Sequence, residues 1–213
     1  MISTVSQKLN LAQGHTKIGT MEAELKEYLA KKEKVTITDD SRIRSAVLIP
    51  IYKKGGQYYI LFTKRSILVK AHRGQISFPG GACHAKDTCL MDTALREAEE
   101  EIGLKPKDVK VLGELDDEIT TTSNFIVTPF VGIIPHPYRF ATSKAEVDKL
   151  IRVPLVALLD KDCLKPDIET IEGGIVVDSY DYYYKGHIIW GATARILNKL
   201  LDIICKIAPG EQK

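Results

Sequence analysis

Apolar residues recur along this chain with two spacings, one typical of helices and the other typical of strands. Three segments place apolar residues on one helical face: residues 21–34, 88–103 and 190–207. Gly103 and Pro106 terminate the second segment, and Pro209-Gly210 terminates the third. The first twenty residues are polar and aperiodic, which predicts a loose arm before the first helix.

Short runs of aliphatic and aromatic residues predict strands at residues 46–52, 58–63, 109–115 and 125–134. Lys53-Lys54-Gly55-Gly56 lies between the first two runs and predicts a hairpin turn. Residues 173–177 and 180–184 predict a second hairpin, and residues 145–160 form a mixed segment around Pro154. Helices and strands mix without a strict βαβ order or an internal repeat, which favours one α/β domain.

Length and composition agree with this prediction. A chain of 213 residues can bury a substantial core, and 44% hydrophobic with 27% charged residues is typical of globular proteins. Neither a signal peptide nor a run of 18 apolar residues is present, so we expect a soluble cytoplasmic protein with no membrane partner. The four cysteines form no C-x-x-C pair, and we interpret them as reduced thiols rather than zinc ligands.

The charge is balanced overall but clustered locally. Thirty Lys and Arg against 28 Asp and Glu leave a net charge of +2, which disfavours nucleic acid as a partner. A basic cluster precedes the second predicted helix, and it comprises Lys64, Arg65, Lys70, His72 and Arg73. An acidic cluster lies on that helix, within residues 97–101. Each cluster alone is also compatible with an ordinary solvated surface.

The acidic cluster has the spacing of a metal site. On a helix, Glu97 and Glu101 are one turn apart, Glu100 lies beside them, and Arg96 is expected to point elsewhere. Like charges at this spacing repel, and a hard divalent cation such as Mg²⁺, which prefers carboxylate oxygens, would relieve the repulsion. The preceding Phe78-Pro79-Gly80-Gly81 turn allows the backbone to approach a ligand or metal closely.

The segment from Gly81 to Leu104 resembles the Nudix box. Its second half matches at every defined position: Arg96, Glu97, Ala98, Glu100, Glu101, Gly103 and Leu104. The first half departs from the pattern, because Asp87 replaces Glu and the spacing from Asp87 to Arg96 is one residue longer. The resemblance extends over residues 42–205. It implies an α/β/α sandwich around a mixed β-sheet, with an N-terminal arm and helix (1–40), a Nudix domain (41–208) and a tail (209–213).

The resemblance also implies roles for individual residues. Glu97 and Glu101 are expected to ligate Mg²⁺ or Mn²⁺, with the carbonyl group of Gly81 completing the shell. Glu100 would ligate a metal or orient the attacking water, and Arg96 would orient a carboxylate by ion pairing. The general base varies in this family. Glu118, in Asp116-Asp117-Glu118, is one candidate, and a solvated acidic loop is the alternative interpretation.

Residues upstream of the box resemble the coenzyme A pyrophosphatase branch of the family. The resemblance is carried by residues 61–66, Lys70, Gly74 and residues 78–81, although Lys70 stands where that branch usually has Arg, and Phe62 where it usually has Leu. It implies cleavage of coenzyme A to adenosine 3′,5′-bisphosphate and 4′-phosphopantetheine. Substrate phosphates would be bound by the basic residues Lys64, Arg65, Lys70 and Arg73.

Two other functions remain open. One is hydrolysis of ADP-ribose or another nucleoside diphosphate derivative, which lacks the 3′-phosphate of coenzyme A. The other is a non-catalytic Nudix-fold binding module, which would typically have lost the carboxylates that are present here. A homodimer is also possible. We interpret Trp190 and the tyrosines at 180–184 as packing residues, although Trp190 could stack on an adenine.

Overall fold

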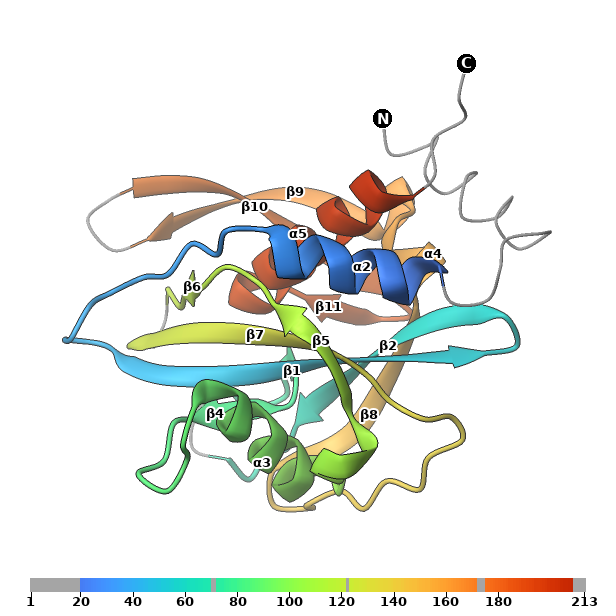
Figure 1. The fold of residues 1–213 in the computed structure, drawn as a ribbon. Helices are drawn as coiled ribbons and strands as arrows, with labels where there is room; N and C mark the ends of the chain where they lie inside the picture. The colour runs from blue at the N-terminus through green and yellow to red at the C-terminus, as the bar shows by residue number, and fades with distance from the viewer. Residues whose placement is uncertain (1–19, 70–71, 122, 172–174, 209–213) are drawn as a thin grey trace.

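The computed structural model describes residues 20–69, 72–121, 123–171 and 175–208 (Figure 1). The expected N-terminal arm, Lys70 and the tail at 209–213 lie outside these residues, and the boundaries expected for the domain stay a prediction. No helix in the described ranges has the length and apolar character needed to cross a lipid bilayer. The four cysteines are unpaired; Cys83 and Cys89 are exposed, Cys163 is buried and Cys205 is partly buried.

A mixed sheet forms the centre of the molecule. Its central strand β1 (Ile43–Lys54) pairs in parallel with β7 (Phe125–Ile133) and antiparallel with β2 (Gln57–Arg65). The sheet order is β3-β2-β1-β7-β5, where β3 is Ile76–Ser77 and β5 is Lys110–Glu114. Three further strands pair with inner strands of this order: β4 (Gly80–Ala82) with β1, β6 (Glu118–Ile119) with β7, and β8 (Val147–Pro154) with β2.

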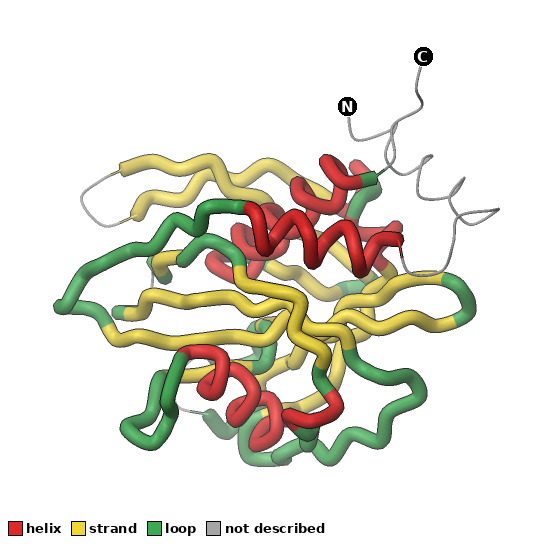
Figure 2. Tube along the Cα trace, viewed as in Figure 1, coloured by secondary structure: helices red, strands yellow, loops and turns green. Residues whose placement is uncertain are grey.

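Helices cover both faces of this sheet (Figures 1 and 2). Helix α3 (Leu90–Ile102) packs on one face, and α2 (Thr20–Lys31) and α5 (Gly191–Ile207) lie on the other. Successive residues of a strand point to opposite faces. In β1, Ala46 and Leu48 therefore join the core beneath α3, whereas Ile49 and Ile51 join the core beneath α2 and α5. The predicted α/β/α sandwich around a mixed sheet is confirmed.

The three predicted helices are present, within a few residues of their expected bounds. Gly103 ends α3 in the left-handed conformation, with φ of 70°, and its N–H donates to Glu99 O at 2.8 Å. Helix α2 belongs to the main core, because Leu25 and Leu29 are buried against neighbouring elements. The hairpin at residues 53–56 is also confirmed, with Gly55 and Gly56 in the turn.

The second predicted hairpin is wrong. Strand β10 (Ile175–Tyr184) runs without a break through most of both expected strands. It pairs antiparallel with β9 (Leu164–Ile171) and β11 (His187–Ile189) in a separate three-stranded sheet. The physical reason is that the turn residues lie elsewhere: Lys185-Gly186, both with positive φ, connects β10 to β11. The mixed segment at 145–160 forms β8 and the short helix α4 (Leu155–Leu158).

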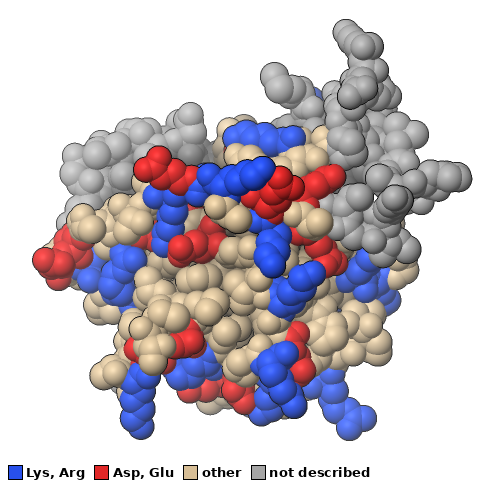
Figure 3. All heavy atoms as spheres, viewed as in Figure 1, with Lys and Arg blue, Asp and Glu red and all other residues tan. Residues whose placement is uncertain are grey.

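Charged residues of both signs are interspersed on the face shown in Figure 3. Several of them form ion pairs between the segment that follows α2 and the segment around β5. Lys32 pairs with Asp116, and Lys34 pairs with Glu114 at 2.7 Å and with Asp117 at 3.1 Å. Asp117 is buried, and its Oδ2 also forms an ion pair with Arg44 Nη2 at 3.2 Å. These contacts attach the chain that follows α2 to the central sheet.

Candidate active site

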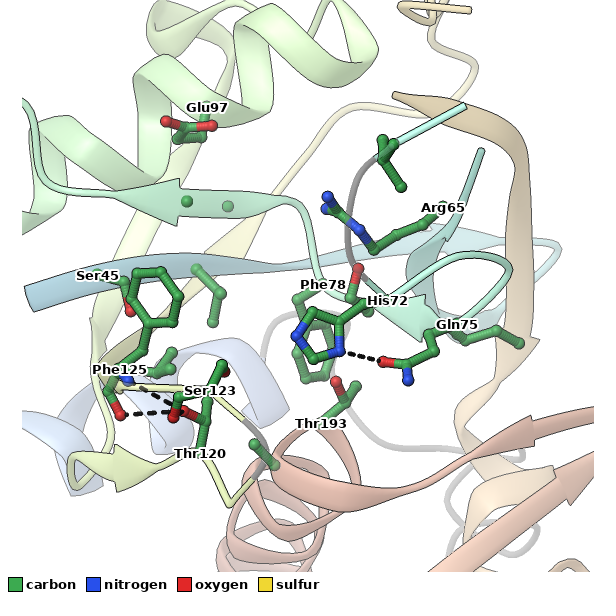
Figure 4. Close-up of a pocket in the computed structure, with 18 of the residues that line it drawn as sticks. Ser45, Arg65, His72, Gln75, Phe78, Glu97, Thr120, Ser123, Phe125 and Thr193 are labelled. Atoms are coloured by element: carbon green, nitrogen blue, oxygen red, sulfur yellow. Dashed lines mark hydrogen bonds between the residues drawn. The ribbon is translucent and has the colours of Figure 1, made fainter. Parts of the chain in front are cut away.

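A cavity of about 540 Å³ opens beside β4 and the carboxylate-bearing face of α3 (Figure 4). Six parts of the chain form its walls: β1, β4 with α3, the segment from the end of β2 to β3, the segment from β6 into β7, the residue just before β8, and the start of α5. The volume is within the range of small-molecule sites. The cavity therefore gathers segments that are more than one hundred residues apart in the sequence.

Glu101 and Arg65 bring opposite charges to this cavity. Arg65 Nη1 lies 3.8 Å from Glu101 Oε1, and the Glu101 side chain is only 5% exposed. Glu101 Oε2 and Arg65 Nε are both buried without a hydrogen-bond partner among the described residues. A buried polar atom without a hydrogen bond destabilises the fold substantially. We therefore expect each of these two atoms to bind a ligand. A cation suits the carboxylate oxygen, and an anion suits the guanidinium group.

Glu97 lies one helical turn before Glu101, and its carboxylate rests against Gly81. A Cβ atom built on Gly81 would lie 2.5 Å from Glu97 Cδ, closer than non-bonded atoms can approach. A larger residue at position 81 would therefore displace the Glu97 carboxylate from its present place beside β4. Gly80, the preceding residue, also has no room for a side chain, because a Cβ atom there would overlap the backbone of β1.

Arg96 does not point away from the acidic cluster, contrary to expectation. Its Nη1 contacts Glu97 Oε1 at 2.6 Å and Glu100 Oε2 at 3.2 Å. Asp87, in the loop before α3, accepts hydrogen bonds from the same guanidinium through both carboxylate oxygens, at 2.9 and 3.0 Å. Arg96 differs from the expectation because its long side chain is held by Asp87 in the loop as well as by the glutamates of α3. Arg96 is thus paired with Glu97 in the structure, and its role in orienting that carboxylate for a metal stays a prediction.

Burial changes the pKa values of the two cavity carboxylates. Desolvation raises the pKa of Glu97 even though Arg96 opposes this shift, and it raises the pKa of Glu101 to about 8. Arg65 works against the shift of Glu101, while the charges of Glu97 and Glu146 add to it. In contrast, the Arg96 guanidinium holds the pKa of Asp87 well below its usual range. Glu97 and Glu101 are therefore carboxylates whose ionised form needs a compensating cation.

Glu146 is a cavity residue that our sequence analysis missed. It lies just before β8, lines the cavity, and raises the pKa values of both Glu97 and Glu101. Its backbone carbonyl accepts a hydrogen bond from Ser66 N at 2.7 Å, which ties this segment to the end of β2. In the sequence, Glu146 is one charged residue among several in a polar stretch, so no local pattern distinguishes it. Only the pairing of β8 with β2 brings it to the site.

The expected phosphate-binding residues separate in the structure. Arg65 alone of the described members lines the cavity. Lys64 lies 3.6 Å from Asp148, and the exposed Arg73 donates from Nε to the backbone carbonyl of Val69 at 2.9 Å. Glu100, half-exposed, contacts Arg96 and does not line the cavity. A direct role for any of these three side chains would require them to leave their present partners.

The structure places Glu118 in an ion-paired cluster, outside the lining of the cavity. Its carboxylate is held by Arg195 at 2.8 Å and by Lys199 at 2.7 Å, and the side chain is 12% exposed. Arg195 Nη2 also donates to the backbone carbonyl of Ile119 at 2.7 Å. Because both carboxylate oxygens of Glu118 are engaged by cations from α5, the geometry gives it a structural role and supports neither a general base nor a solvated loop.

Trp190 is the other residue that the sequence analysis undervalued. It precedes α5, is 38% exposed and lines the cavity together with Phe125. An aromatic side chain in this position offers a surface on which a flat base could stack. The expectation of packing does hold for Tyr182, which is fully buried and donates its hydroxyl to Asn198 Oδ1 at 3.0 Å.

The donor set fits a divalent cation that keeps part of its shell as water or substrate oxygen. Within the described ranges, no three His, Cys, Asp or Glu side chains gather closely enough to hold an ion by themselves. Two carboxylates, Glu97 and Glu101, line the cavity beside Gly81, and one buried oxygen of Glu101 has no partner. Mg²⁺ and similar ions are commonly bound by one or two carboxylates together with waters and substrate phosphates.

The fold and this site define a class of protein: an α/β/α domain in which a glycine turn and a carboxylate-bearing helix meet at a substrate cavity. The NUDIX domain model matches residues 42–163, and the chain belongs to the Nudix family. It is 37% identical over 164 residues to an uncharacterized Nudix hydrolase, NudL, of Photorhabdus laumondii, a match that covers 77% of this chain and 86% of that protein.

A Salmonella heidelberg protein with the same description is 33% identical over 181 residues, covering 85% of this chain and 93% of the relative. The chain is accordingly a Nudix hydrolase. Its fold is similar to the crystal structure of a MutT/nudix family protein from Enterococcus faecalis, with a TM-score of 0.53 and 12% identity over 94% of this chain and 74% of that one.

Proposed function

We propose that the protein hydrolyses coenzyme A or its derivatives to adenosine 3′,5′-bisphosphate and 4′-phosphopantetheine, with Mg²⁺ or Mn²⁺ as cofactor. The observation that carries this proposal is the pair of unsatisfied buried atoms, Glu101 Oε2 and Arg65 Nε, in one cavity. A divalent cation would suit the Glu101 oxygen, and a diphosphate oxygen would suit Arg65 Nε. The cavity volume and the half-exposed Trp190 are compatible with a nucleotide.

Glu97, Glu101 and the carbonyl group of Gly81 are the groups that would hold the metal. When bound, a divalent cation neutralises diphosphate charge and makes water a stronger nucleophile at neutral pH. Glu100 joins this set only if it turns away from Arg96, which contacts it at 3.2 Å in the present arrangement. Arg96 contributes by holding the Glu97 carboxylate, since it is fixed in turn by Asp87.

The remaining residues position the substrate and accept a proton. Arg65 would donate to an oxygen of the diphosphate, and Glu146 would take the proton from the attacking water. The water oxygen bonds to one phosphorus atom, and the bridging P–O bond breaks, leaving two phosphate monoesters. Glu146 is favoured over Glu118 as the base because it lines the cavity, whereas the carboxylate of Glu118 is held by Arg195 and Lys199.

The coenzyme A assignment rests on the basic cluster, which extends from the end of β2 toward β3. The sequence around it resembles the coenzyme A pyrophosphatase branch of the family. Arg65 already lines the cavity. Lys64 and Arg73, on leaving Asp148 and the Val69 carbonyl, are proposed to engage the additional 3′-phosphate together with Lys70. The first alternative is ADP-ribose or another nucleoside diphosphate derivative, which needs only Arg65 and the metal. The second is a non-catalytic module, and the presence of Glu97, Glu101 and Glu146 in one cavity argues against it.

A substrate panel tests the proposal. The protein is incubated with Mg²⁺ or Mn²⁺ and with coenzyme A, dephospho-coenzyme A, ADP-ribose, NADH or a nucleoside triphosphate, and the products are separated by chromatography. We expect the highest kcat/KM for coenzyme A and a lower value for dephospho-coenzyme A. Preferential cleavage of ADP-ribose would replace the substrate assignment. Lack of turnover of every compound would support the binding module instead.

A further inference from the structure

We propose that His72 is a substrate-contacting residue that binds a phosphate oxygen through Nε2, with Gln75 holding its ring in position. The inference deepens the proposed function, on which it rests, by naming a second phosphate ligand beside Arg65. His72 and Gln75 both line the cavity, and the ring of His72 stands among the lining side chains in Figure 4.

The backbone at His72 is in an uncommon conformation. Its φ is 57°, and only one other described residue that is not glycine, Lys185, has a positive φ. Such a conformation has a free-energy cost for an L-residue and is concentrated at functional sites and turns. Two backbone hydrogen bonds support it: Gln75 N donates to His72 O at 3.2 Å, and Gly74 N donates to Arg65 O at 3.1 Å.

The side chain is oriented as well. His72 Nδ1 lies 2.9 Å from Gln75 Oε1 (Figure 4). An amide oxygen can only accept a hydrogen bond, so Nδ1 donates to it, and Nε2 lies on the opposite side of the ring. No hydrogen bond joins Nε2 to any residue in the described part of the chain. The ring is therefore fixed at one nitrogen and available to a ligand at the other.

The chemistry of the neighbourhood selects a phosphate as that ligand. The segment that presents His72 also presents Arg65, and the two are linked because Arg65 N donates to Gln75 O at 2.9 Å. An ionised phosphate oxygen accepts hydrogen bonds, so Nε2 would donate to it while Nδ1 donates to Gln75. Arg65 and His72 would then bind two separate phosphate groups, or two oxygens of one diphosphate.

Metal ligation by His72 is the main alternative for a histidine that is fixed through Nδ1. The geometry does not favour it, because within the described residues no three potential metal ligands gather, and His72 is thus not clustered with Glu97 and Glu101. Mg²⁺ also prefers oxygen donors. Metal affinity is therefore the measurement that separates the two roles.

The test uses His72→Asn in the full chain. The Asn amide reaches about as far as Nδ1 and tolerates positive φ, so the turn and the contact to Gln75 can persist while Nε2 is removed. Lys185→Asn is the matched control, since Lys185 has a φ of 48° in a turn that does not line the cavity. Binding of inorganic diphosphate and of adenosine 3′,5′-bisphosphate is measured by calorimetry with Mg²⁺ present, and Mn²⁺ binding is measured by electron paramagnetic resonance.

We expect His72→Asn to weaken binding of at least one of the two phosphate ligands by roughly tenfold to a hundredfold, the effect of one charge-assisted hydrogen bond. Mn²⁺ affinity and thermal stability should stay at the level of the Lys185→Asn variant. Weaker binding of inorganic diphosphate places the contact at the diphosphate; an effect confined to adenosine 3′,5′-bisphosphate places it at a monoester phosphate. Unchanged binding of both ligands, or a loss of Mn²⁺ affinity, would overturn the proposal.

These binding measurements need no turnover, so they separate the two proposals. If coenzyme A is not cleaved but His72→Asn still weakens phosphate binding, the substrate assignment fails and the role of His72 stands. If coenzyme A is cleaved and His72→Asn leaves KM and phosphate binding unchanged, the role of His72 fails and the proposed function stands.

Discussion

Asp87 holds the guanidinium group of Arg96 with both carboxylate oxygens, at 2.9 Å from Nε and 3.0 Å from Nη2. The third nitrogen of the same group lies 2.6 Å from Glu97. Asp87 itself is tied to its loop by His84 N at 2.8 Å and to α3 by the hydroxyl of Thr93 at 2.8 Å. The loop before α3 thus determines where a carboxylate on the helix points.

Asp87→Asn should reduce kcat/KM and metal affinity by about 10- to 100-fold, although Asp87 does not line the cavity. The Asn side chain has only one acceptor oxygen, so it can accept from one of the two Arg96 nitrogens but not from both. The guanidinium group would then shift toward Glu97 and Glu100. Glu99→Gln is the control on the same helix, because within the described residues the Glu99 carboxylate pairs with the exposed Lys105, at 2.7 Å, and not with the cavity residues. Equal losses in the two variants would contradict the role of Asp87.

Glu101→Gln should stabilise the protein in EDTA while abolishing metal-dependent activity. The pKa of Glu101 in the folded state is about 8, above its usual value of 4.5, so ionisation opposes folding, and stability falls as pH rises between these values. The neutral amide removes this cost, which is on the order of a few kcal/mol at pH 8. Urea unfolding in EDTA at pH 5, 7 and 8 measures the difference between the variant and the unaltered protein.

The stability gained by Glu101→Gln should grow from pH 5 to pH 8, because the unaltered protein loses stability over that range. Parallel pH profiles would show that burial of Glu101 does not control its ionisation. Addition of Mn²⁺ should reverse the order, since a bound ion stabilises only the protein that retains the carboxylate.

Glu146→Gln should lower kcat by about 10²-fold or more, the usual contribution of a general base, with a much smaller change in Mn²⁺ affinity. Glu146 is exposed at the cavity rim, so the substitution should leave the melting temperature nearly unchanged. Steady-state kinetics together with Mn²⁺ titration separate the roles. A loss of metal affinity as large as that of Glu97→Gln would make Glu146 a metal ligand rather than a base.

Glu118→Gln tests the role that the sequence suggested for this residue. The variant removes a partly buried carboxylate from Arg195 and Lys199, so it should destabilise the fold by about 1–3 kcal/mol. At temperatures where the variant is folded, kcat should fall by less than about tenfold. A loss of kcat of several hundredfold without a loss of stability would restore Glu118 as the general base.

The part of the site that lies close together in sequence was the part that could be predicted. Gly81, Glu97 and Glu101 are placed by one turn and one helix, and helical spacing alone aligns the carboxylates. Glu146 and Trp190 reach the cavity through strand pairing and helix packing, which local patterns do not encode. The contact of Arg96 with Asp87 was likewise hidden, because it depends on how the loop folds back on α3.

The basic segment shows why clustering in sequence does not imply clustering in space. Lys64 and Arg65 are consecutive at the end of β2, and the register of β2 with β8 shifts between them. Arg65 lines the cavity, whereas Lys64 pairs with Asp148. The second hairpin was mispredicted for a related reason. Tyrosines and valines have the same strand propensity on either side of residues 178–179, and pairing with β9 decides that the strand continues.

The most direct test of the central proposal is phosphorus NMR of coenzyme A incubated with the protein and Mg²⁺, with Glu97→Gln as the control. We predict that the diphosphate resonances disappear and that two new phosphate monoester resonances replace them, while the 3′-phosphate remains. The signals should not change with Glu97→Gln or in EDTA. Persistence of the diphosphate resonances with the unaltered protein, or loss of the 3′-phosphate instead, would contradict the account.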